Sequence, residues 1–303
     1  MATPVMQSTI ANDLQDTLEM IMTDDSDGLM ANAEMPTYFE EKSTKKAFVD
    51  VEEYGGLGTA QYVPEGEEIP AAGISSGAFT RLWMRKFGLR AMATEEALED
   101  GNTDKVIALA KKIKRAIFKA VDTDAAQMFN RATDTNYPLG DGQPLASASH
   151  TLPGGGTFSN LMATPTAPSE AAYIIARAQA DEQVDRDGYA TGVEITKVCF
   201  PINQRGAWET LSFSEKSPAA GEFNAVNLFN RDKVKLCPVR QWTGSDVDYA
   251  WVTNAENGLV WYWRKRANSR TWVSESQEVM NYSGTARWGR TCFDPRAIIF
   301  ADN

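Results

Sequence analysis

The chain has 303 residues, of which 43% are hydrophobic and 10% aromatic, and a formal net charge of −11. These proportions are ordinary for a folded globular protein, and the longest apolar runs fall well short of the roughly 20 residues that a membrane-spanning helix needs, which excludes a helical membrane protein. The charge is uneven, because residues 1–68 hold fifteen Asp and Glu against Lys42, Lys45 and Lys46. A near-neutral remainder disfavours a sequence-specific DNA-binding protein, which would present a basic face.

Residues 1–48 form a polar, Met-rich arm, in which only Thr9 to Met22 has the apolar spacing of a short helix. The apolar stripe of that segment is too thin to fold alone, so we expect the arm to gain order on another surface. The N-terminus lacks a basic segment followed by an apolar core. No signal or transit peptide is therefore predicted, and we expect a soluble, cytoplasmic protein with no membrane partner.

Residues 49–90 read as a long β-hairpin, with strand-forming residues near its two ends and Gly, Pro and Glu in the middle. The returning limb is expected to run from Phe79 to Phe87. A two-stranded arm without a third strand is marginally stable in water, so the hairpin needs a partner surface. We expect aromatic and basic side chains to make these inter-subunit contacts: Tyr54, Tyr62, Arg81, Trp83 and Arg85.

Two helices are predicted from apolar residues that recur every three or four positions. The longer runs from about Asp104 to Ala132 and would be roughly 40 Å long at about 1.5 Å per residue. A shorter helix is expected from Ser169 to Gln183, after a loop rich in turn-forming residues. Strand-like segments follow without βαβ regularity, which makes α+β the expected fold class.

Candidates for catalysis and for metal or cofactor binding are scarce. His150 is the only histidine and lies in a loop-rich stretch, where we expect at best a local hydrogen bond. The glycines of 55–58 lack the lysine and the helix of a phosphate-binding loop. We predict no catalytic residue, no metal site and no cofactor. The three scattered cysteines are expected to be small, buried, reduced residues without an intrachain disulfide: Cys199, Cys237 and Cys292.

The order of these segments resembles that of the major capsid proteins of tailed bacteriophages, which share the Hong Kong ninety-seven fold with encapsulin shells. Residues 141–160, which contain DGQPLASASH and GGGTFSN, resemble a loop of many such proteins. Asp187-Gly188 followed by Ile195, Val198 and Pro201 resembles the strand entry after the second helix of that family. Residues 287–296, RWGRTCFDPR, resemble its closing segment. The resemblance covers the whole chain.

The resemblance implies a structural subunit of an icosahedral phage head, not an enzyme. Such a subunit forms pentamers and hexamers with copies of itself and encloses double-stranded DNA without sequence-specific binding. It assembles in the host cytoplasm, remains in the virion capsid, and has neighbouring capsomers, scaffolding, portal and decoration proteins as potential partners. The implied parts are an N-terminal arm (1–48), an extended hairpin loop (49–90), a peripheral domain with a spine helix (91–164), an axial domain (165–270) and a return to the peripheral domain (271–303).

Three alternatives stay open at this point. An encapsulin-like compartment shell or another phage structural protein would share the resemblance. The carboxylates of residues 181–187 leave room for a hydrolase that uses an Asp/Glu pair. The tryptophans of the C-terminal third fit a packed core or a large interface, and a carbohydrate-binding face would use them as well.

Overall fold

The structure is a computed structural model that describes residues 20–21, 33–94, 103–190, 192–217, 225–274 and 279–302. The helix predicted at 9–22 therefore lies outside the described residues, apart from Met20 and Ile21. No helix within these ranges is long and apolar enough to cross a bilayer.

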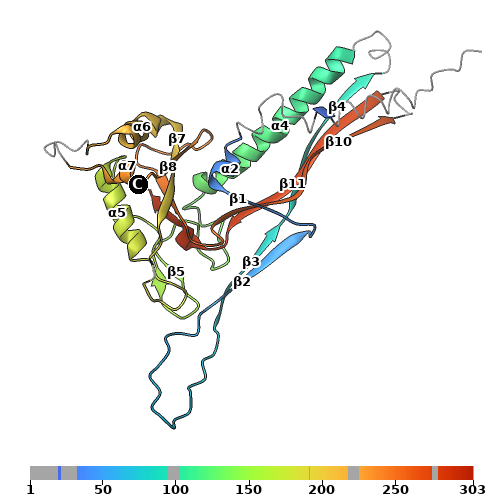
Figure 1. The fold of residues 1–303 in the computed structure, drawn as a ribbon. Helices are drawn as coiled ribbons and strands as arrows, with labels where there is room; N and C mark the ends of the chain where they lie inside the picture. The colour runs from blue at the N-terminus through green and yellow to red at the C-terminus, as the bar shows by residue number, and fades with distance from the viewer. Residues whose placement is uncertain are drawn as a thin grey trace, which may run out of the picture.

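A four-stranded sheet covered by one long helix forms the elongated half of the molecule (Figure 1). Its strand order is β1 (Glu40–Ser43), β10 (Leu259–Ser274), β11 (Val279–Cys292) and β4 (Arg85–Thr94). Helix α4 (Thr103–Asn130) lies against β4 and β11 and confirms the long predicted helix. Its inward residues recur at helical spacing and are all buried: Ala110, Ile113, Ile117, Val121 and Ala125.

A second four-stranded sheet, of order β12-β9-β7-β8, forms the other half. Its strands and helices are β7 (Ile195–Pro201), β8 (Lys235–Val239), β9 (Tyr249–Thr253), β12 (Ile298–Ala301), α5 (Glu170–Asp181), α6 (Arg205–Phe213) and α7 (Leu228–Arg231). Helix α5 confirms the second predicted helix, and Ser169 caps it by accepting a hydrogen bond from the Ala172 amide at 3.1 Å. Helices and strands are mixed throughout, as the α+β prediction requires.

The predicted domain boundaries stay predictions, but two of them fall inside continuous strands. The boundary at 90 lies within β4, and the boundary at 270 lies within β10. Strand β10 pairs with β11 over its whole length, from Leu259 opposite Cys292 to Ser274 opposite Val279. The first sheet therefore includes residues that the sequence assigns to the axial domain.

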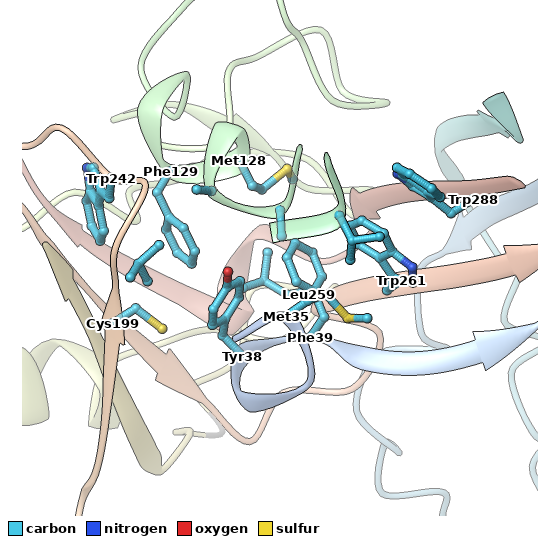
Figure 2. Close-up of a cluster of buried hydrophobic side chains, with 14 of the residues drawn as sticks. Met35, Tyr38, Phe39, Met128, Phe129, Cys199, Trp242, Leu259, Trp261 and Trp288 are labelled. Carbon is cyan, nitrogen blue, oxygen red and sulfur yellow. The ribbon is translucent and has the colours of Figure 1, made fainter. Parts of the chain in front are cut away.

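Aromatic rings fill two hydrophobic cores. The first lies between α4 and the first sheet, receives α2 (Met35–Tyr38), and extends onto the second sheet, where it includes Cys199 (Figure 2). The Trp288 indole donates a hydrogen bond to the Asp124 carboxylate of α4 at 2.8 Å, which fixes helix and sheet together. In the second core, Trp208 and Trp251 meet edge to face with ring centroids 5.2 Å apart.

His150 differs from its sequence-based description. It is fully buried in the short strand β5 (His150–Thr151), which pairs with β6 (Thr157–Phe158). Its Nδ1 lies 2.6 Å from the Asp141 carboxylate, and its ring stacks on Phe158. The expectation of a loop residue is wrong, because the turn-rich segment folds back on itself and encloses the ring.

Candidate functional site

The candidate site is a two-stranded hairpin that forms a sheet of its own. Strands β2 (Phe48–Tyr54) and β3 (Ser76–Trp83) pair antiparallel, with Phe48 opposite Trp83 and Asp50 opposite Arg81. The returning strand ends at Trp83, so the expectation that it runs to Phe87 is wrong. After Met84 the chain pairs with β11 instead of β2, and Arg85 lies opposite Trp288 in the first sheet.

Side chains alternate between the two faces of the hairpin. One face turns inward and carries buried or half-buried residues such as Val51 and Leu82. The other face is open to solvent over most of its area, and we call it the aromatic face. It consists of Phe48, Tyr54, Phe79, Arg81 and Trp83.

Arg81 holds the centre of the aromatic face together. Its guanidinium binds the Asp50 carboxylate through two hydrogen bonds of 2.7 and 2.8 Å. The guanidinium carbon also lies 4.6 Å from the Phe48 ring centroid and 6.0 Å from that of Trp83. The hydrogen bond from Arg81 lowers the pKa of Asp50, so this pair stays charged at neutral pH. The rings are thus ordered before any partner arrives, which reduces the entropy lost on binding.

The aromatic face exposes large apolar rings to solvent. Trp83 has 56% of its surface exposed and Phe79 has 52%, whereas most of the tryptophans in the two cores are fully buried. Exposed apolar patches rimmed by polar residues mark interaction surfaces. The aromatic face therefore has the composition of an unoccupied protein interface, with aromatic residues and an arginine at its centre.

The far end of the hairpin has two parts. The first part, which contains Gly56 and Gly58, is fixed to the turn after α5. The Asp187 carboxylate accepts hydrogen bonds from the Gly56 amide at 2.7 Å and from the Gly58 amide at 3.3 Å. Residues 60–74, which we call the distal loop, extend away from the rest of the molecule (Figure 1). Within the distal loop Tyr62 is 90% exposed. Polar contacts therefore hold this part of the hairpin against the turn after α5.

Three of the five predicted contact residues belong to the aromatic face, with Arg81 and Trp83 close together and Tyr54 at the other end of the strand pair. Tyr62 lies on the distal loop, and Arg85 is an exposed residue of β4. The sequence analysis missed Phe48, Phe79 and Asp187. Period-two alternation around Arg81 would have found the two phenylalanines, whereas the contact of Asp187 with the hairpin has no signal in sequence.

Among the described residues, no three His, Cys, Asp or Glu side chains gather closely enough to hold a metal ion.

No family model matches the sequence, and no curated protein matches it. Solved structures do match over nearly the whole chain. A chain of "Mycobacterium phage Adephagia" has a TM-score of 0.54 at 12% identity, with 99% of this chain and 98% of that chain covered. A chain of "Capsid of native GTA particle computed with C5 symmetry" has a TM-score of 0.54 at 14% identity, with coverages of 88% and 89%.

A third match is the virus-like particle from Pyrococcus furiosus, with a TM-score of 0.56 at 8% identity and coverages of 95% and 98%. Identities this low show the fold alone. The chain has the Hong Kong ninety-seven fold of capsid subunits, and the resemblance drawn from sequence is confirmed at that level.

Proposed function

We propose that this chain is the structural subunit of an icosahedral phage head, which assembles into pentamers and hexamers around double-stranded DNA and catalyses no reaction. The capsid fold carries this proposal, because it accounts for nearly the full length of both chains in matches to phage structures.

The aromatic face supports the proposal physically, because it supplies a contact that a single subunit leaves open. Covering a half-exposed Trp or Phe removes roughly 100 Å² of apolar surface from water, worth about 2.5 kcal/mol per ring at ~25 cal/mol per Å². Much of that free energy offsets the entropy lost on association, so one contact is weak. A closed shell multiplies weak contacts over many copies and becomes stable through their sum.

Other copies of this chain in neighbouring capsomers are the partners that the aromatic face and the distal loop would meet. Scaffolding, portal and decoration proteins are proposed as partners only because the fold is similar to that of phage structures. The DNA would be enclosed without sequence-specific contacts, which agrees with a chain of net charge −11. Residence in the virion capsid after assembly in the host cytoplasm follows from the same role.

Electron microscopy of the expressed full-length chain tests the proposal. We expect closed particles of uniform diameter, or rings of five and six subunits. A monodisperse monomer over the micromolar range, without particles in the presence of phage lysate, would contradict it. Turnover of a substrate by that monomer would favour the hydrolase alternative.

A compartment shell is a second candidate function, because the match to the virus-like particle from Pyrococcus furiosus is as good as those to phages. Particle content separates the two. Nuclease-protected double-stranded DNA in particles purified from their natural source supports the phage head, whereas particles that contain protein and no DNA support a compartment.

A further inference from the structure

Two of the three cysteines are neighbours across the second sheet. Strands β7 and β8 run parallel, and Cys199 lies directly opposite Cys237 in their register. Adjacent strands are about 4.8 Å apart, and disulfides join Cα atoms about 4.4–6.8 Å apart. The backbone geometry therefore permits a bond between the two sulfurs, although 37 residues separate them in sequence.

The two thiols also contact each other and differ in character. The Cys199 side chain lowers the pKa of Cys237, and nearby Lys197 lowers it further. Burial raises the pKa of the Cys199 thiol. The Cys237 thiol additionally donates to the Thr37 carbonyl of α2, with 3.7 Å between sulfur and oxygen. Cys237 is thus the better nucleophile of the two.

The order of strands in the second sheet determines which of the two thiols solvent can reach first. Strand β8 is an edge strand, since the order of the second sheet is β12-β9-β7-β8. Edge strands open more readily than central ones, because they have a neighbour on one side only. Opening of β8 would expose Cys237 before Cys199, which lies on the next strand inward.

We propose that Cys199 and Cys237 are an oxidisable dithiol that closes to an intrachain disulfide between β7 and β8. The oxidant is a small-molecule disulfide. The Cys237 thiolate attacks one sulfur of that disulfide, which breaks the S–S bond and releases one thiol. The Cys199 sulfur, on losing its proton, then attacks Cys237 and releases the second thiol. The protein loses two thiol protons and two electrons, and the oxidant is reduced to two thiols.

The bond would fasten an edge strand that is otherwise held by hydrogen bonds on one side. It would also close a loop through α6 and α7, which restricts the unfolded chain. If the proposed shell function holds, the dithiol stays reduced during assembly inside a cell and oxidises after the particle reaches an oxidising medium. The closure itself does not depend on assembly, so it can be measured on the protein in any oligomeric state.

The test treats the reduced full-length protein with oxidised glutathione under native conditions, followed by alkylation in denaturant and peptide mapping. We expect two of the three thiols to be lost, a mass decrease of about 2 Da, and a linked peptide that contains Cys199 and Cys237. Cys292→Ser is the matched control and should close normally, because the Cys292 thiol donates instead to the Asp294 carbonyl at 3.1 Å.

Single variants test the order of attack. Cys199→Ser should retain a glutathione adduct on Cys237, whereas Cys237→Ser should remain largely unmodified. Retention of all three thiols by the wild-type protein, a link that involves Cys292, or a link between chains would overturn the proposal. The wild-type result decides the question even if a variant fails to fold.

Discussion

Tryptophan serves opposite purposes in the core and in the hairpin. Trp251 is fully buried, and its ring centroid lies within 5.6 Å of those of Trp208, Tyr249 and Tyr173. Trp83 has 56% of its surface in solvent and packs against one ring of its own hairpin. The core ring thus stabilises the subunit that contains it, whereas most of the hairpin ring's apolar surface is free to stabilise a contact with another subunit.

The largest loss of stability is expected from a substitution in the core. Trp251→Ala should lower the free energy of unfolding by about 3–5 kcal/mol, because it removes a buried ring and leaves a cavity among other rings. Denaturant unfolding followed by circular dichroism measures this loss. A loss below about 1 kcal/mol would show that the second core tolerates the cavity and that its rings contribute less than their burial indicates.

His150 should behave as a core residue, although it lies in a polar, turn-rich segment. His150→Ala removes the partner of Asp141, whose side chain is 6% exposed, and should lower the free energy of unfolding by about 1–3 kcal/mol. Ser149→Ala, at an exposed neighbour, is the control and should stay within about 0.5 kcal/mol of wild type. Equal stability of the two variants would restore the interpretation of His150 as an ordinary loop residue.

Trp83→Ala should weaken assembly more than it destabilises the isolated subunit, the reverse of what is expected for Trp251→Ala. We expect the unfolding free energy of the isolated subunit to change by less than about 1 kcal/mol, because the ring is mostly exposed. The yield of closed particles should fall at least several-fold, because each copy loses a contact. Light scattering and electron microscopy measure assembly. Trp272→Ala, at a 38% exposed tryptophan of β10, is the matched control. Equal particle yields from the two variants would argue against the aromatic face.

The smallest effect on the isolated subunit is expected from shortening the hairpin. Replacing residues 60–73 by two glycines keeps the contacts of Gly56 and Gly58 with Asp187, and loop closure entropy changes slowly with length. The thermal midpoint should therefore stay within about 2 °C, while assembly weakens. Normal particles from this variant would remove the distal loop from the set of contacts, and an unfolded product would place it in the core.

Local patterns predicted much of the fold. The helical spacing of apolar residues gave α4 and α5 nearly to their ends, and β-branched runs gave the strands of the second sheet. The end of the hairpin at Trp83 was missed, because β3 and β4 form one continuous alternating segment. What separates them is a change of pairing partner, from β2 to β11, which lies about 200 residues away.

The candidate site also has parts that the sequence predicts and parts that it does not. Tyr54, Arg81 and Trp83 share a face because strand alternation is local, and it is readable from sequence. The tether at Asp187 and the pairing of Cys199 with Cys237 depend on register between distant segments. Parallel strands are joined by a long crossover connection. The spacing of residues along the chain therefore does not reveal which residues lie opposite each other.

Two connections join the hairpin to the first sheet: residues 44–47 lead from β1 to β2, and a single residue lies between β3 and β4. Strand β3 ends at Trp83, β4 begins at Arg85, and the Met84 amide between them donates to the Ala47 carbonyl at 3.0 Å. With one residue between them, β3 can move only a short distance relative to β4. A neighbour that tilts the hairpin would apply torque to β4 and to α4 packed on it. If the proposed shell function holds, curvature of the shell would strain β4 and α4 through this connection.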